Sequence, residues 1–361
     1  MSRQETATVE IPPLFCPIPA ADIPDTSKIS SNVLEWMGRF GFCDTDVERT
    51  SVAANLTAEW ASRIAPNGAI ERLQISADWA CLGLTMDDAF PDGGAHSHSP
   101  ELFVPFAVRV LRSADHPESN FDSDPYCAGF QDISRRIREN ASATVVRRWA
   151  DGVAEWFFGT AVGLSQRVRG VMPSLEDYFN VGARDRGTRA SLAVIELAEG
   201  TSLPNSDMEN PRMRALTQIA STLVTIGNDV YSYHREVQEG SLESNIVGVL
   251  MHWDNLRAPE AMAKAAAIHD RLMCLYMALY DQTKMNAGPE VRLYLDQLSN
   301  FIRGNLDYSA VTPRYKVLPT DVSGRATADW ADSPSDGRLT PLPLPAVAWW
   351  WDELNRLYRS E

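Results

Sequence analysis

The sequence predicts an all-α protein with one main domain. Apolar residues recur at helical spacing almost throughout residues 28–318, and strand-like alternation of apolar and polar residues is nearly absent. The 361 residues, 44% of them hydrophobic, are enough to bury a sizeable core. Roughly ten helices joined by short turns favour a single helical domain over two modules, and no fixed-period repeat indicates a solenoid.

The composition limits the partners and the compartment. A net charge of −15 argues against a nucleic-acid partner and leaves no polybasic patch for a membrane, so an anionic substrate must be held by local charge or by metal. The five cysteines are scattered without a CxxC pair, which favours a reduced, cytoplasmic protein. Residues 1–10 are polar and no apolar run reaches about 18 residues, so we expect neither a signal peptide nor membrane insertion.

Residues 1–27 are predicted to form a strap. Its prolines, among them Pro12 and Pro17, exclude a helix. The intervening Leu14 and Phe15 make the segment too apolar to remain free in water. We therefore expect an extended segment that lies over the main body.

The main domain, residues 28–318, is predicted to be a succession of helices. Each predicted helix has apolar residues at three- and four-residue intervals and is bounded by Pro, Gly or other turn residues. The predicted helices cover residues 33–40, 50–64, 70–85, 102–113, 128–140, 142–170, 189–197, 213–238, 244–253, 259–282 and 289–304.

Residues 319–361 differ in character from the helical domain. The segment 320–345 is rich in Asp, Ser, Gly and Pro, which predicts a flexible linker. It leads to a Trp-rich C-terminal tail with three adjacent tryptophans at 349–351. Three neighbouring indoles are not readily solvated, so we expect the tail to dock on the domain or on a second subunit.

A ladder of polar residues follows one predicted helix. Asn228, Ser232 and Glu236 are four residues apart, so a helix places them on one stripe with about 6 Å between steps. An amide oxygen, a hydroxyl and a carboxylate are hard donors that suit Mg²⁺ or Mn²⁺ better than zinc or copper. The alternative interpretation is a polar helix face that ends in a solvated glutamate.

A second acidic group lies at the end of the helix predicted from residue 70. Pro91 lacks an amide hydrogen and its ring clashes with the carbonyl of Asp87, so the helix should end or kink here. Asp87 and Asp88 then face the negative end of the helix dipole, which is unfavourable without a cation. The alternative is an ordinary polar helix end that runs into a turn.

Together these motifs resemble those of class I terpene synthases. The run from 228 to 236 is similar to their N-D-x-x-S-x-x-x-E triad, and Asp87, Asp88 and Asp92 are similar to a D-D-x-x-x-D variant of their aspartate-rich motif. The resemblance covers residues 15–315. It implies an all-α domain around a central cavity that binds an isoprenyl diphosphate.

The resemblance implies roles for the metal ligands. Asn228, Ser232 and Glu236 would hold one Mg²⁺, and Asp87 would bind two more from the facing helix. Three Mg²⁺ ions, or Mn²⁺ as the alternative, would then bridge the substrate diphosphate. The family also leads us to expect a homodimer. The further candidate ligands are Asp88 and Asp92.

Three more residues match diphosphate-binding positions of the family. Arg235 precedes the last ligand of the ladder, as a diphosphate-binding basic residue does in the family. Arg314 and Tyr315 resemble the Arg-Tyr pair that donates hydrogen bonds once the site closes. A guanidinium suits this task because its planar fork binds phosphate oxygens bidentately. For Arg314 a surface salt bridge is the alternative.

The family also has an arginine that senses diphosphate, on a broken helix before the triad. The matching stretch begins at Tyr178, but its spacing departs from the family pattern because strict counting falls on Gly182. We assign the role to Arg184 and keep Arg186 as a competitor. Gly187 supplies the helix break, with a carbonyl that would face the nascent cation.

The implied reaction is ionisation of an allylic diphosphate followed by cyclisation of the carbocation. The cation must be kept from water, so aromatic side chains should line the cavity. For each candidate the alternative is an ordinary place in the core. The candidates are Trp79, Phe90, Phe179 and Tyr308.

The sequence therefore predicts a terpene cyclase that acts on farnesyl or geranylgeranyl diphosphate and releases a terpene hydrocarbon or alcohol. One alternative is a chain-elongating isoprenyl diphosphate synthase, which needs a second aspartate-rich motif where this chain begins its triad with Asn228. Another is a non-catalytic helical scaffold whose acidic patches bind a partner or solvent.

Overall fold

The computed structural model describes residues 9–92, 97–119, 124–315 and 330–359, and within these ranges all regular elements are helices. The all-α prediction is confirmed. In chain order the elements are α1 (Ser27–Arg39), α2 (Asp46–Ala54), α3 (Thr57–Ile64), α4 (Ile70–Asp87), η1 (Asp88–Asp92), α5 (Pro100–Asp115), α6 (Pro125–Asn140), α7 (Ala143–Arg169), α8 (Leu175–Asp185), α9 (Thr188–Glu199), α10 (Asn205–Met208), α11 (Pro211–Glu239), η2 (Leu242–Ser244), α12 (Ile246–Trp253), α13 (Ala258–Asn286), α14 (Pro289–Val311), η3 (Pro313–Tyr315) and α15 (Pro345–Arg359).

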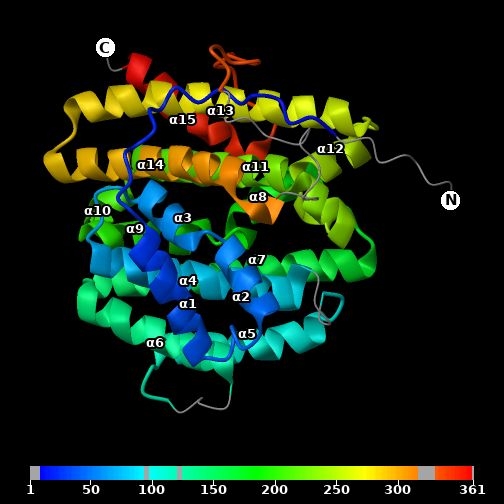
Figure 1. Cartoon of the computed structure of the whole chain (residues 1–361). Helices are drawn as coiled ribbons and strands as arrows, with labels where there is room; N and C mark the ends of the chain where they lie inside the picture. Colours follow the sequence, from blue (N-terminus) through cyan, green and yellow to red (C-terminus); the bar gives the residue numbers. More distant parts are fainter. Residues whose placement is uncertain (1–8, 93–96, 120–123, 316–329, 360–361) are drawn as a thin grey trace.

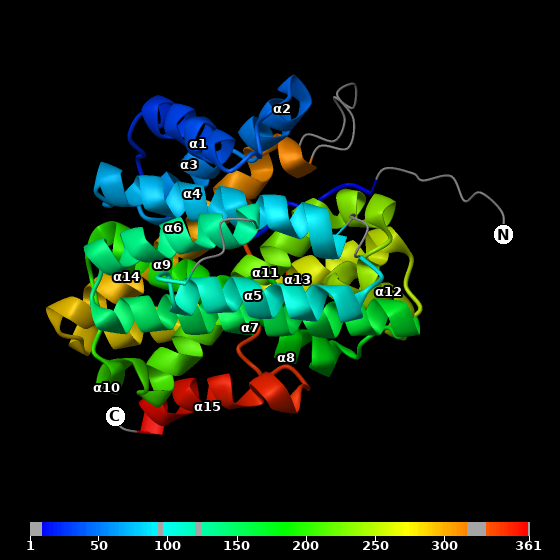
Figure 2. The same cartoon turned by 90° about the horizontal axis from the view of Figure 1, so that it is seen from below.

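The long helices pack around one continuous apolar core. α11 lies against α13 and α14, while α7 lies against α8 and α9. Figure 2 shows α1 and α2 on one face of the molecule and α15 on the opposite face. None of the helices in the described ranges combines the length and the apolar character needed to cross a bilayer.

Local sequence fixes several helix ends. Ser174 begins α8 with a capping box, in which its hydroxyl accepts the Asp177 amide and the Asp177 carboxylate accepts the Ser174 amide. α11 begins at Pro211, where the missing amide hydrogen costs nothing. It ends at Glu239 and is capped by Gly240, whose φ of +73° is the left-handed conformation that glycine adopts without strain.

The predicted single helix over residues 50–64 is wrong. The chain breaks between α2 and α3 at Asn55 and Leu56, and Leu56 has a φ of +47°. The break frees the carbonyl of Asn55, which accepts a 2.7 Å hydrogen bond from the hydroxyl of Tyr308. The break thus coincides with a contact to a residue about 250 positions away, which local periodicity does not register.

The helix predicted to end at Gly304 continues to Val311. Gly304 is not a helix end but a point of close approach between α14 and α3. A Cβ atom at this position would lie 2.4 Å from the backbone oxygen of Arg63, so only glycine fits without moving a helix. This contact also brings the next residue of α14 close to α3.

The N-terminal segment crosses the body in extended conformation, over α13 in Figure 1. Leu14 and Ile18 are buried. The amide of Phe15 donates to Asp270 of α13 at 2.9 Å, and Arg303 of α14 donates to the carbonyl of Ile18 at 2.6 Å. The described part of this segment therefore lies against the helical body, held by buried side chains and by backbone hydrogen bonds.

The C-terminal helix α15 packs on its own chain, against α8, α11 and α13. Trp350 and Trp351 are only 2% and 1% exposed, and the indole of Trp350 donates to Gln218 of α11 at 3.1 Å. Of the two predicted docking places for the tail, the structure therefore shows the domain. The predicted linker falls partly on residues 316–329, which lie outside the described residues.

Asp270 joins both ends of the chain to α13, so Asp270→Ala should lower the free energy of unfolding by about 3 kcal/mol. One carboxylate oxygen accepts the Phe15 amide, and the other accepts the Ser335 amide and hydroxyl at 2.8 and 2.7 Å. Urea unfolding measures the loss. Asp254→Ala, which breaks an exposed pair with Lys264, is the control and should change stability by less than about 1 kcal/mol. An equal effect of both variants on the free energy of unfolding would contradict this stabilising role of Asp270.

Candidate active site

A cavity of about 170 Å³ lies between α3, α4, α7, α9, α11 and α14. It brings together most of the residues that the sequence singles out, although they come from distant parts of the chain. The predicted site residues that line it are Trp79, Asp87, Gly187, Asn228, Ser232, Arg235, Glu236, Tyr308, Arg314 and Tyr315.

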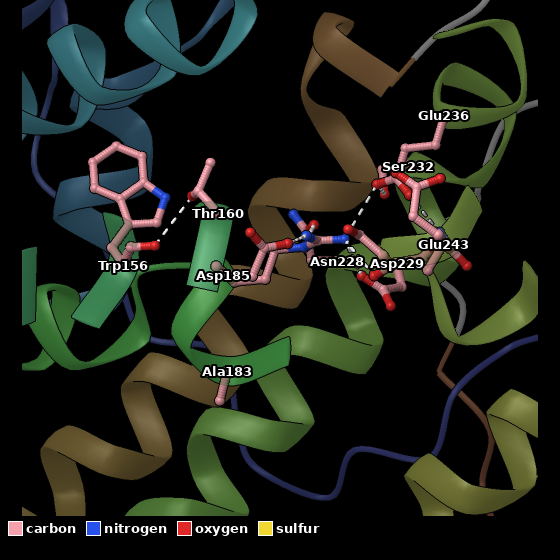
Figure 3. A network of polar contacts seen from close by, with 12 residues as sticks. Trp156, Thr160, Ala183, Asp185, Asn228, Asp229, Ser232, Glu236 and Glu243 are labelled. Carbon is pink, nitrogen blue, oxygen red and sulfur yellow. Dashed lines mark hydrogen bonds and ion pairs between the residues drawn. The ribbon is translucent and has the colours of Figure 1, made fainter. Parts of the chain in front are cut away.

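The polar ladder lies on one side of α11 (Figure 3). The hydroxyl of Ser232 donates to Glu236 at 2.6 Å, and Asn228 donates to the hydroxyl of Tyr315 at 2.6 Å. Burial raises the pKa of Glu236 to about 7, against the opposing attraction of Arg186. A buried carboxylate beside an amide oxygen and a hydroxyl is a donor set that suits a hard divalent cation.

Behind the ladder lies a buried carboxylate that the sequence analysis did not single out. Asp229 is 0% exposed and accepts the hydroxyl of Tyr178 at 2.7 Å and the amide of Ile246 at 2.8 Å. It also accepts a guanidinium hydrogen of Arg186 at 2.7 Å. Asn245 completes the cluster by donating to Glu236 at 2.9 Å. The adjacent Asn-Asp pair was visible in the sequence, but nothing local indicated that its second member faces inward.

Of the two candidate sensing arginines, Arg186 lines this cavity and Arg184 does not. The Arg186 guanidinium contacts Asn228 at 3.2 Å, Asp229 at 2.7 Å and the carbonyl of Ser244 at 3.1 Å. The side chain of Arg184 is exposed, donates to the carbonyl of Asn180 and borders a separate cavity. Arg184 lies in the last turn of α8, whereas Arg186 is the capping residue that follows it. Two positions at helical spacing correspond to about 200° of rotation, so the two side chains point in different directions.

Gly187 forms the break between α8 and α9 that the sequence predicts. It has a φ of +59° and caps α9. A Cβ atom here would contact the indole of Trp156 at 3.4 Å, so the glycine lets the ring lie close to the backbone. Its carbonyl accepts the amide and the hydroxyl of Ser191, at 3.1 and 3.2 Å.

At the acidic end of α4 the two aspartates differ in their surroundings. The α-helix ends at Asp87, as Pro91 predicts, and continues as the π-helical turn η1. Asp87 lines the cavity, whereas both carboxylate oxygens of Asp88 accept hydrogen bonds from Arg314 at 2.6 Å. The side chain of Asp92 lies outside the described residues.

Asp88 also pairs with Arg235, so one carboxylate holds two guanidinium groups near the cavity. Burial favours a raised pKa, but the attraction of Arg314 and Arg235 outweighs it and holds the pKa of Asp88 below its usual value. The carboxylate therefore stays ionised at neutral pH. Through this pair the short helix η3, which carries Arg314 and Tyr315, is tied to the end of α4.

The aromatic predictions divide evenly. Trp79 and Tyr308 line the cavity, but Phe90 and Phe179 do not. Phe90 stacks on Phe106 of α5 with ring centroids 4.1 Å apart, because the π-helical turn η1 turns it toward that helix. Phe179 borders the separate cavity near α15.

Two further indoles of the wall, Trp60 and Trp156, were missed. Both lie on predicted helices, at 50–64 and 142–170, but periodicity identified them only as apolar residues. A salt bridge at the rim was missed too: Arg167 donates to Glu243 at 2.6 Å. The sequence signal for it was the acidic residue just beyond the triad.

The cavity thus has a rim of oxygen donors and arginines and a wall of aromatic rings, inside an all-α domain. This combination defines the protein class as that of the class I terpene synthases.

Known proteins agree with this classification. The profile of the family described as "Terpene synthase family 2, C-terminal metal binding" matches residues 78–274. Spiroviolene synthase from Streptomyces violens is 34% identical over 349 residues, which cover 96% of this chain and 97% of that protein. Phomopsene synthase from Allokutzneria albata is 28% identical, with 97% and 99% covered. The crystal structure of the SVS_A2 protein from ancestral sequence reconstruction has a TM-score of 0.86, 32% identity and covers 96% of this chain and 100% of that one.

The chain belongs to terpene synthase family 2. It is a terpene cyclase, a lyase, and the metal-binding domain of the family implies that it uses a divalent metal. The prediction of a terpene cyclase is confirmed, and the findings do not support the alternatives of a chain-elongating synthase or a scaffold.

Proposed function

We propose that this cyclase binds farnesyl or geranylgeranyl diphosphate with three Mg²⁺ ions, ionises it and cyclises the resulting carbocation. One observation carries the proposal: hard oxygen donors, arginines and aromatic rings from separate helices border one cavity. Carboxylates and guanidinium groups share the same rim, so it is suited to metal cations and to an anionic diphosphate together.

The ladder and Asp87 fit a set of Mg²⁺ ions. Among the described residues no three His, Cys, Asp or Glu side chains are grouped as a metal site, so the donor set depends on the amide of Asn228 and the hydroxyl of Ser232 beside Glu236. These are oxygen ligands, as Mg²⁺ requires. Bound Mg²⁺ would neutralise charge on the leaving diphosphate. Asp88 is better suited to hold Arg314 and Arg235 than to bind metal, because its oxygens already accept both guanidinium groups.

The arginines would bind and orient the diphosphate. Arg186 replaces Arg184 as the sensing residue in this proposal, because Arg186 borders the cavity and contacts the ladder. Arg235, Arg314 and the hydroxyl of Tyr315 would supply further donors from the same rim. Their guanidinium groups stay charged and bind phosphate oxygens in pairs. The leaving diphosphate then stays bound, apart from the carbocation.

The aromatic wall would protect the cation. Trp60, Trp79, Trp156 and Tyr308 surround the remainder of the cavity and exclude water from it. Each ring face would stabilise a nearby positive charge by about 0.5–2 kcal/mol. The hydroxyl of Tyr308 is turned away, since it donates to the carbonyl of Asn55. We also propose a homodimer, as the family resemblance implies, with a contact surface other than the buried faces of Trp350 and Trp351.

Incubation with each diphosphate and Mg²⁺, followed by gas chromatography with mass spectrometry, tests the function. We expect a cyclic terpene and equimolar diphosphate from at least one substrate, and no product after EDTA treatment. Addition of isopentenyl diphosphate should not produce a prenyl diphosphate of greater chain length. Absence of any terpene from both substrates would overturn the proposal, and so would a longer diphosphate as the main product.

A further inference from the structure

We propose that Asn305 is a positioning residue, which fixes the orientation of the Trp60 indole in the cavity and thereby sets the ratio of cyclisation products. The inference rests on the proposed function and deepens it. The two residues belong to different helices, Trp60 to α3 and Asn305 to α14, and both line the cavity. Nothing in their sequence separation of 245 positions suggests a pair.

The contact between them is a buried hydrogen bond. The indole nitrogen Nε1 of Trp60 donates to the amide oxygen Oδ1 of Asn305 at 3.3 Å. The two residues are 9% and 6% exposed. An indole N–H can only donate, so this bond also fixes which end of the Asn305 amide faces Trp60. The amide is therefore held with its oxygen toward the ring.

The close approach of α3 and α14 makes this bond possible. The backbone of Gly304 lies directly against that of Arg63, where a Cβ atom would be 2.4 Å from the Arg63 oxygen. Asn305 is the next residue, and Trp60 lies one helical turn before Arg63. The short asparagine side chain therefore reaches the indole. A longer polar residue would not fit between helices in backbone contact.

The amide nitrogen of Asn305 indicates that its hydrogen bond to Trp60 has a role beyond packing. The nitrogen Nδ2 of Asn305 is buried and has no hydrogen-bond partner among the described residues. A buried amide with one unpaired end is costly, so an apolar residue would be the more stable choice if packing were its only task. The part of Asn305 that has a partner is the part that holds Trp60.

The orientation of Trp60 matters because an aromatic ring attracts a cation at its face and not at its edge. Trp60 and Trp79 have ring centroids 6.1 Å apart and planes inclined by 39°, so they form one corner of the wall. If the Trp60 ring rotated, its edge instead of its face would be turned toward a cation at this corner of the cavity. The carbocation intermediates would then differ in relative stability, and with them the products.

This role predicts a separation between turnover and product ratio in the variant Asn305→Leu, which removes the acceptor at similar volume. Diphosphate release should keep its kcat/KM within about threefold, because ionisation occurs at the rim before the ring acts. The ratio of the main product to the side products should change by about twofold to thirtyfold, the range that a cation–π contact supplies. The substrate is whichever of farnesyl and geranylgeranyl diphosphate the wild-type enzyme cyclises.

Trp60→Phe keeps an aromatic ring but removes the N–H group, and it completes a double-mutant cycle. If Asn305 acts through the indole, Asn305→Leu should change the product ratio by less than about 1.5-fold in the Trp60→Phe background. Equal changes in both backgrounds would overturn the inference, as would an unaltered ratio in Asn305→Leu. If Asn305→Leu does not fold, an unaltered product ratio in Trp60→Phe alone would also overturn the inference.

Ser299→Ala is the matched control on α14. Its hydroxyl bonds the hydroxyl of Tyr276 on α13 at 2.9 Å and does not border the cavity. It should lower the thermal midpoint without changing the product ratio. If Ser299→Ala and Asn305→Leu alter the ratio alike, Asn305 has only a structural role. A wild-type enzyme without any terpene product would refute the proposed function itself, which keeps the two failures distinguishable.

Discussion

Arg186→Met should lower kcat/KM for diphosphate release by about a thousandfold or more, while Arg184→Met stays within about threefold of wild type. Loss of one preorganised donor to a developing charge costs about a hundredfold to a thousandfold, and this arginine also contacts the ladder at Asn228. Arg184 is the matched control because it lies two positions away, in the last turn of α8, with an exposed side chain. Diphosphate release measured at saturating Mg²⁺ compares the two.

The stability of Arg186→Met must be measured beside its activity, because Asp229 loses a charged partner in the core. The carboxylate keeps its hydrogen bonds from Tyr178 and Ile246, at 2.7 and 2.8 Å, so we expect a lower thermal midpoint with retained helical circular dichroism. Arg186→Lys, which keeps the charge but loses the planar fork, should fall between wild type and Arg186→Met. A larger loss of activity in Arg184→Met than in Arg186→Met would restore the assignment of the sensing role to Arg184.

Glu236→Ala and Asn228→Leu should abolish turnover, with activity below about a thousandth of wild type. Both variants remove an oxygen donor from the ladder and therefore weaken the site expected to hold Mg²⁺. Helical circular dichroism should persist, because α11 is anchored over its length by packing on α13 and α14. Turnover measured over a Mg²⁺ titration tests whether excess metal restores activity.

Gln238→Ala is the control for the ladder. It lies on the same helix with an exposed side chain, and it should leave turnover and Mg²⁺ dependence unchanged. Unaltered turnover in Glu236→Ala would remove the ladder from the metal site. Loss of activity together with loss of helical signal would instead reassign Glu236 to the fold, through its bonds with Ser232 and Asn245.

The positions that the sequence predicted and the structure shows share a periodic or local cause. Asn228, Ser232 and Glu236 fall on one stripe because a helix repeats every 3.6 residues, whatever surrounds it. The end of α4 at Asp87 follows from the ring of Pro91. These features needed no knowledge of the rest of the chain.

The errors arise where distant parts of the chain decide. Arg184 and Arg186 are equivalent by composition, and only the packing of α8 on α11 shows which face meets the cavity. The helix predicted over 50–64 breaks at Asn55, where the hydroxyl of the distant Tyr308 bonds the freed carbonyl. Phe90 turned to Phe106 because a π-helical turn follows Asp87. None of these contacts leaves a local signal.

By itself, the sequence determined an all-α cyclase and predicted a ladder of oxygen donors and an acidic helix end, because the last two depend on helical geometry and short-range chemistry. Only the tertiary structure decided that Arg186 enters the cavity, that Asp229 holds it there, and that Asn305 reaches Trp60. The physical reason is the same in each case. These assignments depend on which faces of separate helices come into contact, and that is set by packing between residues far apart in the chain.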